Sequence, residues 1–231
     1  MDAFDDFERL TEGVPLFPLP DLVLFPFTSR SLHIFEPRYR IMTKDALEGT
    51  RYIALANLIG DWQPVYFAKP DIHPTVCVAK IVTFDEFEDG RFNLEVKGVV
   101  RARIESEWEV SGYRVADLSV MHDHIPPVER EMAREEMERT IQLLKETASP
   151  ELCQSLFKEI EESDDDLNRI AFSYRLADFL KLDTALKLRL RDTNSTLERF
   201  AVINGMLEEL AKVLSWGPGE NKDDQLDVSL N

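Results

Sequence analysis

Two cysteines and four histidines are the side chains of this chain best suited to nucleophilic or metal chemistry. Cys77 lies in an apolar run between Val76 and Val78, which predicts a buried core thiol and not a nucleophile. Cys153 falls on an amphipathic stretch, and neither cysteine has a partner motif, so we expect no disulfide and a reducing, cytoplasmic setting. The sequence contains no nucleophile elbow, phosphate-binding glycine loop or dinucleotide fingerprint. We therefore predict no catalytic residue and no cofactor.

The histidines and the acidic clusters do not form a recognisable metal motif. His122 and His124 are two residues apart and would share one face of a strand, but no cysteine or third histidine lies near them. His73 stands in a proline-containing loop without a second ligand. The acidic run at 161–166 lacks the central glycine and distal glutamate of a calcium loop, which favours helix capping. No metal site is predicted.

A mildly basic hairpin is the other candidate for binding. Arg101 and Arg103 are two residues apart in a predicted strand and should project from one face. One interpretation is a small patch that binds an acceptor group. The other is a solvated outer face balanced by Glu95 and Glu105, and the balance of charge favours this second interpretation.

Charge is the strongest compositional signal. Asp and Glu number 44 against 27 Lys and Arg, which gives a net charge of −17. A field of this sign repels phosphates, so nucleic acid is an unfavourable partner. No apolar run approaches the ~18–20 residues of a membrane span, and the first residues lack a secretory pattern. The acid-rich ends, residues 1–13 and 217–231, are predicted to be a flexible terminus and a disordered tail.

The elements that must position these residues change character after Pro126. Short β-branched and aromatic segments, broken by proline and glycine, fill residues 14–126, whereas helical spacing dominates residues 127–216. We therefore predict an α+β protein in which an all-helical bundle lobe follows a β-rich lobe.

Several elements can be placed within these lobes. The sequence predicts a strand at 52–59 that is buried on both faces, a hairpin that turns at 88–91 and a bulge or bend at Gly98. Pro37 suits the first turn of a helix, and the pattern at 195–198 is a capping box that opens the last long helix.

Four segments resemble a known family. Residues 15–26 read PLFPLPDLVLFP, and residues 32–40 read LHIFEPRYR. Further along, residues 89–94 read DGRFNL and residues 113–116 read YRVA. In this order the segments resemble the amino-terminal substrate-recognition domain of Lon-type proteases, in the compact form found as a stand-alone bacterial protein. The resemblance extends over about residues 13–215.

The resemblance implies a PUA-like pseudo-barrel followed by a helical bundle. It also implies a non-enzymatic module that binds unfolded or degron-bearing polypeptides or acts as an adaptor, because the sequence contains neither an ATPase motif nor a Ser-Lys peptidase motif. Two alternatives stay open: a binder of small molecules or RNA through the PUA-like lobe, and a hydrolase with dispersed catalytic residues that no local pattern supports. The partner and the oligomeric state are not predicted.

Exposed aromatic side chains in a proline-containing loop are the predicted peptide-binding residues. They are Trp62, Tyr66 and Phe67. The residues of the resembling segments are predicted to be mainly structural, and these are Phe17, Phe25, His33, Phe35, Glu36, Pro37, Arg38 and Tyr39.

Specific contacts follow for the structural set. We expect Phe17, Phe25 and Phe35 to pack in the core together with Leu24. Glu36 should form an ion pair with Arg38 or Arg40. The ring of His33 should donate a hydrogen bond to a nearby carbonyl.

Overall fold

The computed structural model describes residues 11–158 and 165–215 of the chain. The predicted tails at the two ends, and most of the acidic run at 161–166, lie outside the described residues. The chain divides into two compact units, Met1–His122 and Asp123–Asn231. The separate folding of the predicted lobes, 14–126 and 127–216, stays a prediction.

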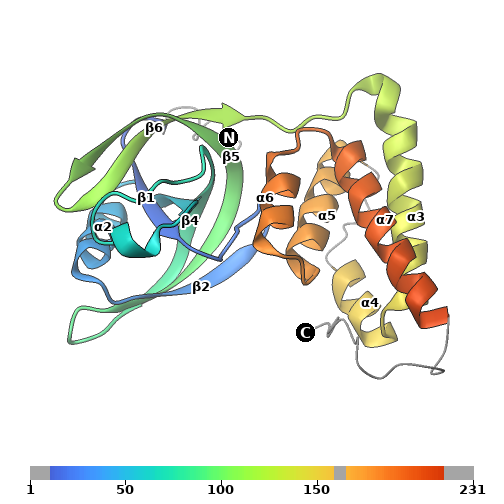
Figure 1. Ribbon diagram of the computed structural model, residues 1–231, viewed down its shortest axis with the longest axis horizontal. Coiled ribbons are helices and arrows are strands. Elements are labelled where there is room, and N and C mark those ends of the chain that lie inside the picture. Colours follow the sequence, from blue (N-terminus) through green and yellow to red (C-terminus); the bar gives the residue numbers. More distant parts are fainter. Residues whose placement is uncertain (1–10, 159–164, 216–231) are drawn as a thin grey trace. The chain divides into compact units, whose positions relative to one another are not determined.

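The first unit is built on a mixed six-stranded sheet. Its elements in the described part are β1 (Val14–Leu19), β2 (Ser29–Ile34), α2 (Pro37–Glu48), β3 (Tyr52–Asn57), the short 3₁₀ turn η1 (Gln63–Val65), β4 (Thr75–Glu86), β5 (Phe92–Val110) and β6 (Tyr113–Met121). The strand order is β2-β5-β4-β3-β1-β6, and β5 also pairs with β6. Strands β1, β3, β4, β5 and β6 therefore close into a ring, as Figure 1 shows. The predicted pseudo-barrel is confirmed.

A long, bulged strand makes this closure possible. The first part of β5 pairs with β2, and its second part pairs with β6. The register between β4 and β5 shifts next to Gly98, which confirms the predicted bulge. A Cβ at Gly98 would lie 2.1 Å from the carbonyl oxygen of Phe25, so only glycine fits where these two backbones approach.

Strand β3 is buried on both faces, as its apolar run predicts. Ile53 and Leu55 belong to the core cluster on which α2 packs through Tyr39 and Met42. Ala54 and Ala56 belong to a second cluster on the opposite face of the strand. Alternation along a single strand thus supplies two apolar layers.

Two of the expectations for individual side chains were wrong. Phe35 is 60% exposed and is not part of the core, because Ile34 takes the inward direction at the end of β2 and the next side chain must point outward. Its ring stacks on His33, with centroids 6.1 Å apart. Arg101 and Arg103 do not form an exposed pair, since Arg101 is fully buried where β5 is flanked by β4 and β6.

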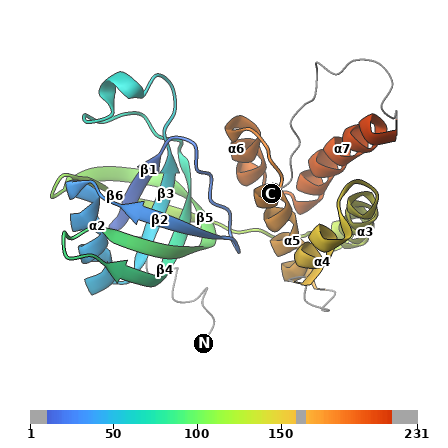
Figure 2. The same ribbon diagram turned by 90° about the horizontal axis from the view of Figure 1, so that it is seen from below.

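The second unit is all helical in its described part, as predicted. It contains η2 (Pro127–Glu129), α3 (Arg130–Thr147), α4 (Pro150–Lys158), α5 (Asp166–Phe179), α6 (Thr184–Asp192) and α7 (Thr196–Ser215). Helices α3 and α7 lie side by side, and α5 packs on α7 (Figures 1 and 2). None of the helices in the described ranges has the length and apolar character that crossing a bilayer would need.

Side-chain caps and one buried arginine order this bundle. Asp183 caps α6 by accepting a 2.7 Å hydrogen bond from the Leu186 amide. The fully buried Arg199 pairs with Asp123 at 3.0 Å and lies 4.1 Å from the centre of the Tyr174 ring. The hydroxyl of Tyr174 donates to the same carboxylate at 2.8 Å, so the buried charges are paired and hydrogen-bonded.

Candidate functional site

The connection between β3 and β4 carries the three aromatic residues singled out in the sequence. This aromatic loop, residues 58–74, projects from the strands in Figure 2, and a bridge between Leu58 and Ile72 closes its base. The Tyr66 ring lies 5.9 Å from Trp62 and 5.1 Å from Phe67, both in edge-to-face geometry. The structure therefore brings all three residues into one cluster.

The tip of this loop exposes apolar side chains to solvent. Phe67 is 88% exposed, and Val65 is 44% exposed. Trp62 and Tyr66 are half-buried beneath them. Exposed apolar groups on a rigid support are typical of binding surfaces, because covering them removes apolar area from water.

An ion pair from the first turn of α2 holds the loop in place. Arg38 contacts Glu36 at 3.1 Å and donates a 3.5 Å hydrogen bond to the backbone oxygen of Tyr66. The hydroxyl of Tyr66 donates to the other oxygen of Glu36 at 2.5 Å. The guanidinium of Arg38 also lies 4.6 Å from the centre of the Tyr39 ring and 5.0 Å from that of Tyr66. Four side chains thus form one network.

Electrostatics keeps the donors of this network protonated. Burial raises the pKa of Tyr66, and its hydrogen bond to Glu36 raises it further. Burial alone would lower the pKa of Arg38, but Tyr39 and Glu36 outweigh that effect and raise it. Tyr66 therefore remains a hydrogen-bond donor at neutral pH.

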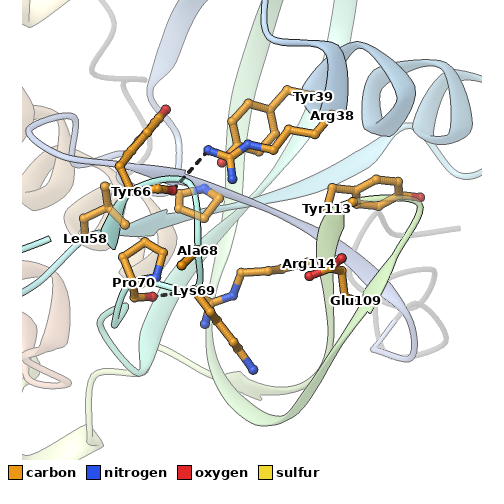
Figure 3. Close-up of a pocket in the computed structure, with 12 residues that line it drawn as sticks. Arg38, Tyr39, Leu58, Tyr66, Ala68, Lys69, Pro70, Glu109, Tyr113 and Arg114 are labelled. Atoms are coloured by element: carbon orange, nitrogen blue, oxygen red, sulfur yellow. Dashed lines mark hydrogen bonds between the residues drawn. The ribbon is translucent and has the colours of Figure 1, made fainter. Parts of the chain in front are cut away.

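A small pocket lies between α2, the aromatic loop and the β5–β6 hairpin. Figure 3 shows Arg38 and Tyr39 on one side, Lys69 and Pro70 from the loop, and Arg114 from β6. The cavity volume is about 20 Å³, which is enough for roughly one water-sized group.

A second set of charges involves Lys69 and Arg114, which line this pocket. Glu107 accepts from Lys69 at 2.7 Å through one oxygen and from Nε of Arg114 at 3.0 Å through the other. Arg114 also donates to the backbone oxygen of Pro70 at 2.7 Å. Burial would raise the pKa of Glu107, but the hydrogen bonds from Lys69 and Arg114 outweigh it and lower that pKa. The loop is therefore tied to the hairpin as well as to α2.

Two tyrosines of the pocket differ in their hydrogen bonding. Tyr113 donates a 2.7 Å hydrogen bond to Asp45, and burial together with this bond raises its pKa to about 12. Burial also raises the pKa of Tyr39 to about 12, although the nearby Arg38 opposes the shift. Among the residues that the structure describes, the Tyr39 hydroxyl has no hydrogen-bond partner.

The other singled-out residues lie in structural positions. Phe17 and Phe25 are buried, and Phe17 packs edge-to-face on Tyr39 at 4.7 Å. Pro37 opens α2. The ring of His33 makes a 2.7 Å hydrogen bond with the side-chain oxygen of Asn93.

The histidine pair considered for metal binding is exposed, with His122 and His124 both outside regular strands. Within the described ranges, no three His, Cys, Asp or Glu side chains gather as metal ligands would. Sequence reasoning missed Lys69, Glu107 and Arg114 as site residues. Arg114 stands in one of the four resembling segments, which was the available signal.

Residues 13–209 match the model of the ATP-dependent protease La (LON) substrate-binding domain. The chain belongs to this family. Both the α2 corner and the aromatic loop lie inside the matched residues, so the site is part of the Lon substrate-binding domain itself.

Curated relatives match a portion of the chain. A Lon protease of Trichlorobacter lovleyi is 36% identical over 99 residues, which is 42% of this chain and 12% of that protein. A Lon protease of Desulfosudis oleivorans is 27% identical over 96 residues, with the same shares. The matched part thus spans about an eighth of the length of these relatives.

Solved structures share the Lon amino-terminal fold. A Lon N-terminal domain protein from Xanthomonas campestris has a TM-score of 0.54 and 22% identity, and the match covers 89% of this chain and 99% of that one. The N-terminal domain of a Mycobacterium avium complex Lon protease has a TM-score of 0.66 and 14% identity, with 86% and 99% covered. Similarity at these identities concerns the fold.

Proposed function

We propose that this chain is a non-catalytic polypeptide-recognition module, and that its aromatic loop binds exposed apolar segments of unfolded or degron-bearing proteins. The observation that carries the proposal is the exposure of Phe67, at 88%, on a loop anchored at both sides. Complete burial of one large apolar side chain contributes about 1.5–3 kcal/mol of favourable free energy. Membership of a substrate-binding family supports the same role.

The anchoring of the loop supports binding of a flexible chain. A loop held by Glu36 and Arg38 loses little conformational freedom on binding. Most of the conformational entropy lost in the complex is therefore that of the client polypeptide. The pocket beside it is too small for an organic ligand, which gives no support to the small-molecule alternative. The setting we propose is the cytoplasm, where both buried cysteines remain reduced. The same surface would serve an adaptor.

Calorimetry with a reduced and alkylated model protein tests the proposal, with the folded form of that protein as the negative control. Phe67→Ser should weaken binding of the unfolded client about tenfold, because it removes the most exposed apolar contact. The melting temperature should stay unchanged, since Phe67 is exposed. Val128→Ser, at an 83% exposed position of the second unit, is the matched control and should bind like the wild type. Absence of binding to unfolded clients by the folded wild-type chain would refute the proposal.

A further inference from the structure

The pocket beside the aromatic loop is flanked by two carboxylates whose oxygens are occupied. Both oxygens of Glu36 are occupied, one by Arg38 and one by Tyr66. Both oxygens of Glu107 are likewise occupied, by Lys69 and Arg114. These two carboxylates therefore offer little to a ligand that donates hydrogen bonds.

The donor side of the pocket is different. Tyr39 is 95% buried, lines the pocket and directs its hydroxyl into it, as Figure 3 shows. In the described part of the chain this hydroxyl has no hydrogen-bond partner. The oxygen atom is not one of the fully buried side-chain atoms that lack a partner, so water or a ligand that enters the pocket can accept from this hydroxyl. Lys69 adds an ammonium group with one ion-pair partner and a 59% exposed side chain.

Charges of both signs act on the Tyr39 hydroxyl. The guanidinium groups of Arg38 and Arg114 favour negative charge at this position, and the carboxylate of Glu36 opposes it. The hydrogen bonds and the ion pair of Arg38 use its Nε and Nη2 atoms. None of the described residues forms a hydrogen bond or ion pair with its Nη1 atom. The group that would complete this pocket is an anionic acceptor, and a single oxygen atom of it would occupy the cavity of about 20 Å³.

We infer that this pocket binds a carboxylate of a bound polypeptide, with the Tyr39 hydroxyl and the Arg38 and Lys69 side chains as donors. The inference rests on the proposed function, because the apolar residues next to that carboxylate would lie on the aromatic loop. The carboxylate can come from the chain terminus or from an acidic side chain. The preferred client segment therefore combines an apolar residue with a nearby negative charge.

The carboxylate of Glu109 opposes the binding of an anionic ligand. Glu109 also lines the pocket and is exposed, opposite Arg114 in the β5–β6 register. Its negative charge repels an incoming carboxylate. Glu109→Gln should therefore increase affinity for a carboxylate-bearing peptide, whereas it should leave affinity for a neutral peptide unchanged.

Fluorescence anisotropy with three labelled peptides tests the inference on the full chain. The peptides are a glycine–serine hexapeptide that ends in phenylalanine and leucine with a free carboxylate, its carboxy-terminal amide, and the amide with one internal glutamate. The free acid should bind about tenfold more tightly than the amide, because hydrogen bonds to a charged group are lost in the amide. Recovery of affinity by the glutamate peptide would assign the carboxylate to a side chain as well.

Tyr39→Phe removes the hydroxyl and keeps the ring that packs on Phe17. It should abolish the preference for the carboxylate and leave binding of the amide unchanged. Val128→Ser, the exposed control position of the second unit, should keep the affinity for the acid within about twofold of wild type. Lys69→Met, at an exposed position, is a second variant that should weaken binding of the acid alone.

The outcomes separate this inference from the proposed function. Equal binding of the acid, the amide and the glutamate peptide, or an unchanged preference in Tyr39→Phe, overturns the carboxylate site. Failure of all three peptides overturns it as well, even where the unfolded client still binds and the proposed function stands. Failure of the unfolded client refutes the proposed function itself.

Discussion

The hydroxyl of Tyr66 donates a 2.5 Å hydrogen bond to Oε1 of Glu36, thirty positions earlier in the chain. This bond joins the tip of the aromatic loop to the residue that precedes α2. The same carboxylate holds Arg38, whose guanidinium packs against the rings of Tyr39 and Tyr66. The direction in which the loop presents its apolar side chains therefore depends on one carboxylate.

Glu36→Gln tests this dependence. The variant should lower the free energy of unfolding by about 1 kcal/mol, because a charge-assisted bond and an ion pair are weakened together. Protease cleavage in the aromatic loop should become faster, and affinity for an unfolded client should fall. Tyr66→Phe, which leaves the Glu36–Arg38 pair intact, should give a smaller effect. A loop that resists proteolysis equally in Glu36→Gln and wild type would contradict the anchoring role.

Two glycines should respond in opposite directions to alanine. Gly98→Ala should cost about 3 kcal/mol, because the new Cβ would lie 2.1 Å from the backbone oxygen of Phe25. Gly205 is an exposed residue inside α7 with no atom near its Cβ position. Gly205→Ala should therefore stabilise the chain by about 0.5–1 kcal/mol. Urea unfolding measures both, and a tolerated Gly98→Ala would argue against the close approach.

The buried pair of the helical unit should be sensitive to loss of its cation. Arg199→Met removes the guanidinium that pairs with Asp123, and removing one partner of a buried ion pair typically costs about 3–5 kcal/mol. Lys212→Ala breaks an exposed pair with Glu209 and should change stability by less than about 1 kcal/mol. Urea unfolding followed by far-UV circular dichroism measures the free energy of unfolding of both variants. Equal stabilities for the two would mean that the buried pair contributes no more than a surface pair.

Acid should weaken the attachment of the loop to the hairpin. The pKa of Glu107 is lowered in the folded chain from its ordinary value of 4.5, so its contribution to stability is complete above that value. The contribution is lost as pH falls through the lowered folded pKa. The melting-temperature difference between wild type and Glu107→Gln should therefore shrink between about pH 6 and about pH 3. A difference that is constant over this range would show that Glu107 is not linked to folding.

Local sequence signals predicted much of the architecture. The apolar run at 52–59 located β3, and Pro37 marked the start of α2. Gly98 marked the bulge because a backbone approach excludes a side chain there. These features depend on residues close together in the chain, which is why pattern could identify them.

Long-range contacts could not be predicted in the same way. The direction of the Phe35 side chain depends on which residues of β2 point inward. A shift of one residue in the register of the strand would reverse that direction. The burial of Arg101 depended on strands that pair with β5 from both sides. The pocket lies between α2, the aromatic loop and β6. The proximity of Lys69, Glu107 and Arg114 depends on the closed ring of strands, so the sequence alone could not predict it.

The closure of the ring has a consequence for the order of synthesis. Val14 of β1 pairs with Ala116 of β6, so the first strand finds its last neighbour only after about a hundred further residues have been made. A nascent chain that stops before β6 leaves β1 and β5 with open edges, which are templates for wrong pairing between chains. Ribosome-bound intermediates of this lobe should therefore need protection until β6 emerges, and contacts of such sequence separation favour slow folding.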